Sequence, residues 1–159
     1  MPNVYIKKPH YKQEIDSSCV PTCLRMMFEF FGIKVSESEL RKKLKTKSFG
    51  THVINIINIT DEDYGIHTDI EFWSLTELKY YLKTFKRPCM VMLWTEHLTH
   101  WDIDCLHSVI VNGFDDNNVI INDPYFNQDE FHIPFEAFLK SWQLNDGLVI
   151  LFHRSDDKK

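Results

Sequence analysis

The sequence lacks the features of a membrane, secreted or nucleic-acid-binding protein. Its longest apolar runs, such as CMVMLW and LVILF, fall far short of the ~20 residues that a membrane-spanning helix needs. The opening residues, MPNVYIKKPH, contain no apolar core of a secretory signal. Basic residues are not in excess, because 18 Lys and Arg face 23 Asp and Glu. We therefore expect no membrane segment and no nucleic-acid partner.

Cysteine is also sparse, with only Cys19, Cys23, Cys89 and Cys105. A secreted scaffold held together by disulfides would be shorter and denser in cysteine. We therefore expect free thiols in the reducing cytoplasm. A chain of 159 residues with 43% hydrophobic residues is long enough for one well-buried core, so we expect a single domain over residues 1–159.

Hydrophobic periodicity places most helices in the first half of the chain and most strands in the second. The expected helices cover residues 19–31, 35–45, 51–65, 74–85 and 134–142, and the expected strands cover 66–73, 89–94, 106–114, 118–124 and 147–153. Ser17 or Ser18 can cap the first helix, and Gly32 suits its end. This segregation indicates an α+β fold, in which an N-terminal helical half packs on a C-terminal antiparallel sheet.

The stretch YKQEIDSSCVPTC places a thiol, Cys19, at the start of the first predicted helix. Unpaired backbone N–H groups at a helix N-terminus favour the thiolate, which is the nucleophilic form. Gln13, six positions earlier, has an amide that can donate a hydrogen bond to an oxyanion. A cysteine is usually a small core residue. We expect this of Cys23 on the first helix and of Cys89 and Cys105 in the strand patterns.

Among the histidines, His107 stands in the alternating strand pattern LHSVIVNGF. A hairpin that turns at residues 115–118 would bring His107 near position 126, within a few residues of Asp123. The Asp123 carboxylate could then orient the imidazole and fix its tautomer. The neighbouring Asn122 should point to the other face of the strand, and it takes this role if the register is shifted by one residue.

The segment HLTHWDIDCLH raises the alternative of a metal site, because His97, His100, Cys105 and His107 are all potential ligands. Their spacing fits no established zinc signature, so we expect no metal and no other cofactor. His97, His100 and Trp101 are expected to form a loop over a cleft.

The order Gln13, Cys19, His107 and Asp123 resembles that of the papain-like cysteine peptidases. The motifs QEIDSSCVPTCLRMMFEFFG and HSVIVNGFDDNNVIINDPYF are similar to those of the double-glycine leader peptidases. These are the peptidase domains of bacteriocin exporters and their stand-alone relatives, peptidase family thirty-nine of clan CA. The resemblance implies a papain-like fold, Cys19 as nucleophile, His107 as base, Asp123 as orienting residue and Gln13 as oxyanion-hole residue. One difference from the family is Val20, directly after the nucleophile, where many members have a glycine.

The resemblance further implies a cysteine peptidase that cleaves a peptide or protein substrate through a thioester, after a small-residue pair of the Gly-Gly type. Two alternatives stay open. The thioester could pass to an amine or a thiol, which would make the protein an acyltransferase, deamidase or transpeptidase. The chain could also be a non-catalytic module that keeps the fold and binds peptides.

Overall fold

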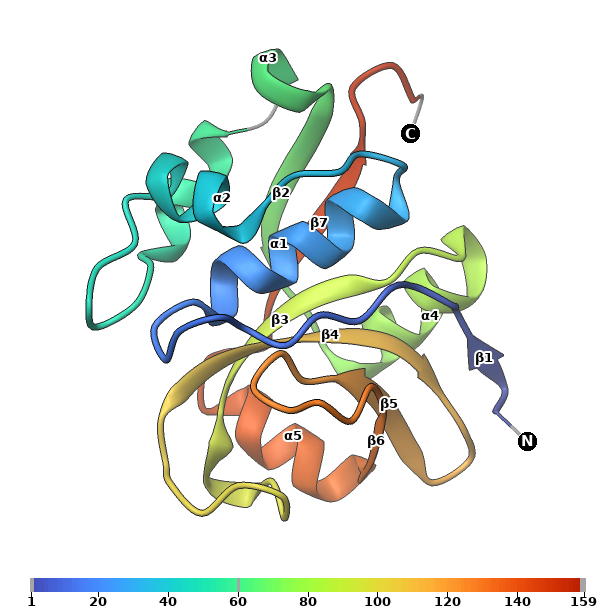
Figure 1. Cartoon of the computed structure of the whole chain (residues 1–159). Coiled ribbons are helices and arrows are strands. Elements are labelled where there is room, and N and C mark those ends of the chain that lie inside the picture. Colours follow the sequence, from blue (N-terminus) through green and yellow to red (C-terminus); the bar gives the residue numbers. More distant parts are fainter. Residues whose placement is uncertain (1, 60, 158–159) are drawn as a thin grey trace.

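An antiparallel sheet organises the computed structural model, which describes residues 2–59 and 61–157 (Figure 1). Its strands are β1 (Val4–Tyr5), β2 (Ile66–Phe72), β3 (Cys89–Trp94), β4 (Leu106–Phe114), β5 (Asn118–Asn122), β6 (Phe131–Pro134) and β7 (Leu148–Arg154). They lie in the order β2-β7-β3-β4-β5-β6, and β1 pairs with β4. Every pairing between these strands is antiparallel, so the predicted α+β class with an antiparallel sheet is confirmed.

Helices cover both faces of this sheet (Figure 1). They are α1 (Cys19–Phe30), α2 (Glu37–Lys43), η1 (Val53–Asn58), α3 (Asp61–Tyr64), α4 (Leu75–Phe85), η2 (Thr95–His97) and α5 (Phe135–Gln143). Side chains alternate along β3, so that Met90 and Met92 pack with α1, whereas Val91 and Leu93 pack with α4 and α5. Both faces of the central strands are therefore buried. The N-terminal helices do pack on the sheet as predicted, and the later helices cover the opposite face.

Helix α1 is anchored by one apolar face, on which Cys23, Leu24 and Phe28 are fully buried. Each such side chain contributes about 1.5–3 kcal/mol through the hydrophobic effect. Ser18 occupies the N-cap position, but its hydroxyl donates to the carbonyl of Ile15, so it makes no side-chain cap on the helix. Because α1 packs against β4, its first residue is held in a fixed place beside that strand.

Two parts of the secondary structure differ from the predictions. Residues 51–65 form the 3₁₀ helix η1 and the separate short helix α3, not one helix. The β-branched residues Val53, Ile54 and Ile56 lose side-chain freedom in an α-helix, which accounts for the short, tighter form. Strand β6 was not predicted, because four residues that end in Pro134 show little alternation.

The β4–β5 hairpin turns at residues 115–118 as predicted. Ile110 pairs with Asn122, and a β-bulge just before Gly113 shifts the register by one residue. Gly113 also pairs with β1, and a side chain at this position would collide with the carbonyl of Val4. The glycine therefore allows the N-terminal segment to lie close against β4.

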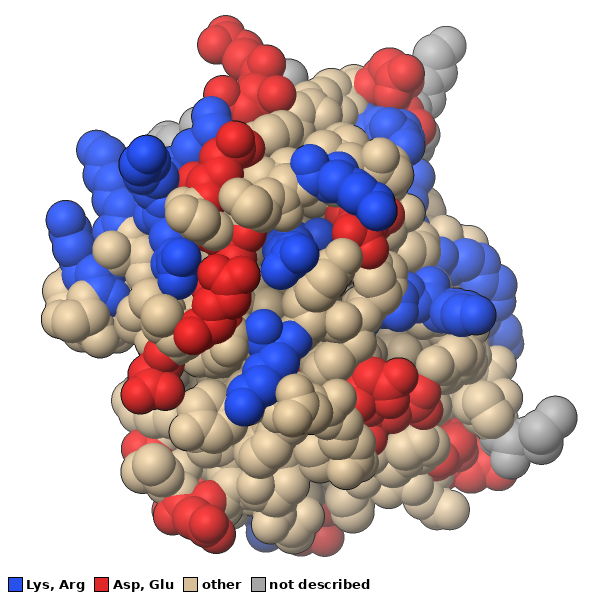
Figure 2. All heavy atoms as spheres, in the orientation of Figure 1, with Lys and Arg blue, Asp and Glu red and all other residues tan. Residues whose placement is uncertain are grey.

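Basic side chains gather over α2 and the residues that follow it (Figure 2). Arg41 forms ion pairs with Glu37 and Glu14, and Lys43 pairs with Asp63. Acidic side chains interleave with the basic ones, as expected of a solvated helix face. Among the described residues, no helix is long and apolar enough to cross a membrane.

Candidate active site

A cleft of about 320 Å³ opens beside the N-terminus of α1. It is lined by Gln13, Asp16, Ser17, Cys19, Ser48, Phe49, Gly50, Trp101, Ile103, Cys105, Leu106, His107 and Tyr125. These residues come from the segment before α1, the loop after α2, and the start of β4 with the loop before it. The cleft therefore brings together the ends of elements that are far apart in the sequence.

The cleft contains Cys19 and His107, and Asp123 lies directly behind the histidine. His107 Nε2 is 2.7 Å from Asp123 Oδ1, and the two residues are 3% and 0% exposed. An ionised carboxylate only accepts hydrogen bonds, so Nε2 carries the proton. The other ring nitrogen, Nδ1, is left for Cys19, whose thiol lines the same cleft and whose pKa this imidazole lowers.

The three groups shift one another's ionisation. Burial alone would raise the pKa of Cys19, but the hydrogen bond and charge of His107 lower it below its usual value. Burial would lower the pKa of His107, but its hydrogen bonds to Asp123 and Cys19 raise it to about 10. The arrangement therefore favours a thiolate beside an imidazolium at neutral pH.

Three further donors hold the Asp123 carboxylate. Its Oδ2 accepts from His100 Nε2 at 2.9 Å and from the Trp101 indole N–H at 2.7 Å, while Oδ1 also accepts from the Tyr125 backbone N–H at 3.0 Å. Burial would raise the pKa of Asp123, but the hydrogen bonds from both histidines keep it well below its usual range. The sequence pattern placed His100 and Trp101 over the cleft, but it did not indicate this contact.

Gln13 also lines the cleft, but its amide is turned toward the backbone. Its Nε2 donates to the carbonyls of Ile15 and Asp16 at 2.9 and 3.0 Å, and its Oε1 is buried with no partner. Turning the amide over would set an oxygen against two carbonyl oxygens, which is unfavourable. In this conformation the side chain has no N–H free for an oxyanion.

A comparison with protein families adds to this geometry. The family model described as Peptidase C39 family matches residues 7–157, which is nearly the whole chain. The chain belongs to the Peptidase C39 family. The predicted resemblance to the double-glycine peptidases is therefore confirmed at the level of the family.

Individual C39 relatives agree in sequence and in fold. The transport/processing ATP-binding protein ComA of two Streptococcus pneumoniae strains is 25% identical over 153 residues. The match covers 96% of this chain and 20% of ComA, so the chain spans about a fifth of those relatives. The solved peptidase domain of Streptococcus ComA, a bi-functional ABC transporter involved in quorum sensing, is 24% identical. It has a TM-score of 0.74 over 91% of this chain and 96% of that one.

A second solved structure is a double glycine motif protease from an AMS/PCAT transporter in complex with the leader peptide. It is 21% identical to this C39 chain, and its TM-score is 0.74 over 96% of this chain and 95% of that one. At this identity the two likenesses to solved structures show the shared fold. The papain-like arrangement predicted from the motifs is thus confirmed for the fold.

The structure also shows where the alternative orienting residue, Asn122, and the other cysteines lie relative to this site. Asn122 points away from His107 and donates to the backbone carbonyl of Asp129, so the register favours Asp123. Cys23 is fully buried as predicted, and burial raises its pKa. The prediction that Cys105 is a core residue was wrong, because it is only partly buried and lines the cleft.

The suggested metal ligands do not form a cluster. His100 and His107 both bind Asp123, and His97 lies nearest to Glu96 at 3.9 Å. Within residues 2–59 and 61–157, no group of three or more His, Cys, Asp or Glu side chains is arranged to hold a metal ion.

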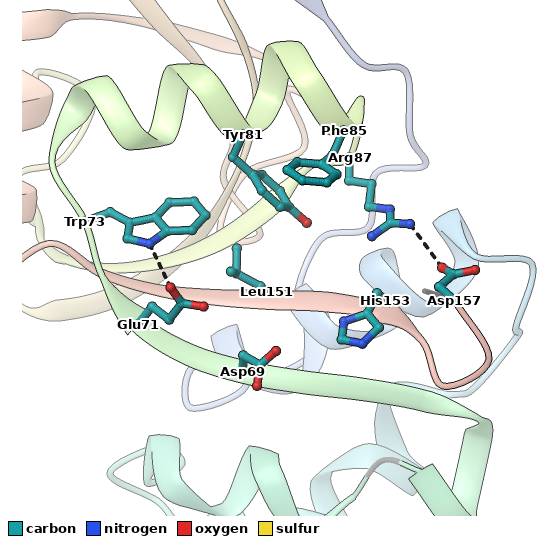
Figure 3. Close-up of a pocket in the computed structure, with 9 residues that line it drawn as sticks. All are labelled: Asp69, Glu71, Trp73, Tyr81, Phe85, Arg87, Leu151, His153 and Asp157. Carbon is teal, nitrogen blue, oxygen red and sulfur yellow. Dashed lines mark hydrogen bonds and ion pairs between the residues drawn. The ribbon is translucent and has the colours of Figure 1, made fainter. Parts of the chain in front are cut away.

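A second pocket, of about 220 Å³, lies between α4 and the β2–β7 end of the sheet (Figure 3). Figure 3 shows Arg87 paired with Asp157 and the Trp73 indole donating to Glu71. The side chain of Tyr81 forms part of its wall. No cysteine is among the residues that line this pocket, so the cleft beside α1 is the better candidate for a site with a nucleophilic thiol.

Proposed function

We propose that this chain is a cysteine peptidase in which Cys19, His107 and Asp123 form the catalytic triad. The observation that carries the proposal is that the Cys19 thiol lines one cleft with His107, whose imidazole is held by the buried Asp123 carboxylate at 2.7 Å. Nucleophile, base and orienting group are the three parts that thiol-dependent acyl transfer requires.

The reaction has two steps. The Cys19 thiolate attacks the peptide carbonyl carbon, and the His107 imidazolium gives its proton to the leaving amine as the C–N bond breaks. The acyl group is then held on sulfur as a thioester. His107, now neutral, takes a proton from water, whose oxygen attacks the thioester. The C–S bond breaks to release the carboxylic acid and the Cys19 thiolate, which restores the thiolate–imidazolium pair.

The oxyanion is stabilised by backbone N–H groups at the N-terminus of α1, with the Cys19 N–H nearest to the reacting carbon. Gln13 contributes a second donor only after its amide turns away from the Ile15 and Asp16 carbonyls. We therefore propose that substrate binding rotates the Gln13 side chain. Loss of one oxyanion donor typically costs about 10²–10³-fold in rate.

The proposed substrate is a peptide with a pair of small residues, of the Gly-Gly type, before the cut. This follows from the related double glycine motif protease, which was solved with its leader peptide. Val20, next to the nucleophile, is 1% exposed and packs in the core with α1, so its side chain is not part of the cleft wall. We also propose the cytoplasm as the location, since all four cysteines are free thiols and a nucleophilic thiol needs reducing conditions.

Cleavage of a synthetic peptide with Gly-Gly before the scissile bond, followed by mass spectrometry, tests the proposal. Cys19→Ala should abolish cleavage, whereas Cys23→Ala, one helical turn away, should retain it. Cleavage by the Cys19→Ala variant would refute the assignment of the nucleophile.

The same assay separates the alternatives. Added amines or thiols should not divert the acyl group, because water is the proposed acceptor; formation of an amide or thioester product would identify a transferase. Iodoacetamide should label Cys19 selectively. A protein that binds the peptide but is neither labelled at Cys19 nor active would be a non-catalytic binding module.

A further inference from the structure

The loop between η2 and β4, residues 98–105, contacts the candidate triad through Asp123. His100 and Trp101 from this loop share one oxygen of Asp123, while His107 takes the other. A buried carboxylate must find protein donors in place of water, and each oxygen of Asp123 has two.

We propose that His100 and Trp101 are positioning residues that act through Asp123. They hold Oδ2 in place, so that Oδ1 stays aligned with His107 Nε2. This inference rests on the proposed peptidase function and assigns two more residues to the same site. The hydrogen bonds of both side chains go to Asp123, which acts on the thiol only through His107.

The loop is built to hold these two side chains still. Thr95 closes it, because the Thr95 backbone N–H donates to the Cys105 carbonyl at 3.0 Å and its hydroxyl accepts from the Cys105 N–H at 2.9 Å. Thr95 is fully buried, and Leu98 is 1% exposed and anchors the loop in the core. The donors on Asp123 are therefore in place before any substrate arrives.

His100 fits the role of a neutral donor. Its Nε2 must carry a proton to bind the ionised Asp123, and its Nδ1 is buried with no hydrogen-bond partner among the described residues. A lone pair at Nδ1 is less costly there than an unpaired N–H of an imidazolium. The ring also stacks on Phe131, with centroids 4.1 Å apart and planes at 14°. His100 thus orients Asp123 without adding a second cation that would compete with His107.

Trp101 donates a hydrogen bond to Asp123 and also covers the contact between Asp123 and His107. Its indole N–H binds Asp123 Oδ2, and its ring lies 4.7 Å from the His107 ring and 4.8 Å from that of Tyr125. An aromatic ring at this position keeps water from the hydrogen bond between His107 and Asp123. In a region of low dielectric that charge-assisted bond is stronger than it would be in water.

The test uses variants that keep shape and remove only the donor. His100→Phe can still stack on Phe131, and Trp101→Phe keeps a ring beside His107. We expect His100→Phe to lower kcat about 10–100-fold with little change in KM, as loss of a hydrogen bond to a charged group predicts. His100→Gln, which offers an N–H at a similar distance, should recover part of the loss. The matched control is His97→Phe, since His97 precedes the same loop and should have no effect.

The pH dependence of Cys19 alkylation by iodoacetamide gives a readout that needs no substrate. A less firmly held Asp123 supports the imidazolium less, so the alkaline limit of the thiolate–imidazolium pair should move to lower pH in His100→Phe. The other titratable groups nearby include Cys23, whose pKa is raised by burial, and His10, whose pKa is lowered by burial. Asp16, Cys105 and Tyr125 line the cleft, and Lys8, whose charge acts on Cys23 and His10, has its pKa lowered by burial to about 7. These groups are the same in wild type and in His100→Phe, so the shift between the two profiles reports on Asp123.

A double-mutant cycle decides whether His100 acts through Asp123. In an Asp123→Ala background, His100→Phe should cause no further loss of kcat. An equal loss in both backgrounds, or a lower Tm with an unchanged pH profile, would overturn the inference. Trp101→Phe gives the same test if His100→Phe does not fold. If Cys19 of the wild-type protein were alkylated only near and above the pKa of a free cysteine, this would instead refute the proposed peptidase function.

Discussion

An asparagine should be a poor replacement for Asp123, although it has nearly the same shape. The carboxylate offers two oxygens to four N–H donors, two on each oxygen. An amide offers one oxygen and one NH₂ group. If its oxygen faces His107, its NH₂ opposes His100 and Trp101; if it is turned over, its NH₂ opposes His107 and the Tyr125 backbone N–H.

The size of the effect follows from the two donors left without an acceptor. A buried donor without a partner costs about 1–3 kcal/mol, so two of them destabilise the folded state by about 2–6 kcal/mol. For a domain of this size, 1 kcal/mol lowers Tm by about 2–4 °C. At a central value of about 3 kcal/mol, Asp123→Asn should lower Tm by about 6–12 °C. It should also lower kcat about 10–100-fold, because the imidazolium loses its counter-charge.

The difference in stability should depend on pH in a defined direction. The pKa of Asp123 is depressed in the folded protein, so its contribution is fully present above the unfolded value near ~3.9 and is lost as pH falls toward the folded value. The gap in Tm between wild type and Asp123→Asn should therefore be full at pH 7 and smaller near pH 3.

Thermal unfolding followed by circular dichroism, together with the peptide-cleavage assay, measures both effects. Asp116→Asn is the matched control, since Asp116 lies in the exposed β4–β5 turn and its Oδ1 accepts from only one side-chain amide. An Asp123→Asn variant with a wild-type Tm and full kcat would show that the four-donor account of the site is wrong.

Four further outcomes are expected. His107→Ala should reduce kcat more than Asp123→Ala, because the ion pair forms without its orienting group but not without the imidazole; equal losses in the cleavage assay would contradict this. The pH profile of kcat/KM should be a bell, with an acid limb for thiolate formation and an alkaline limb near pH 10, where His107 loses its proton. The stability due to His107 should be present below its ordinary pKa of 6.5 and fade as pH rises through about 10, as urea unfolding across this range would show. Gly113→Ala should destabilise the fold by about 1–3 kcal/mol in urea unfolding, because its Cβ collides with the Val4 carbonyl; an unchanged midpoint would refute this.

The sequence by itself determined the local features on which the site depends. The three-and-four spacing of apolar residues placed Cys19 at the start of a helix, because helical periodicity is a property of adjacent residues. The alternation in LHSVIVNGF and the turn at residues 115–118 predicted the hairpin and brought Asp123 within a few residues of His107. The β-bulge before Gly113, which the sequence pattern did not indicate, shifts the pairing by one residue and so brings Asp123 and not Asn122 to His107. Strand alternation and turn position are both local, so they can be read from one short segment.

Only the tertiary structure decided which distant segments meet at the triad. The donors His100 and Trp101 reach Asp123 because Thr95 closes their loop and Leu98 anchors it in the core. No periodicity encodes such contacts, since they depend on how an irregular loop packs against a strand more than 20 positions away. The pairing of β2 with β7 and the turn of the Gln13 amide toward its own backbone have the same origin. Each depends on the packing and hydrogen bonds available once the whole chain is folded.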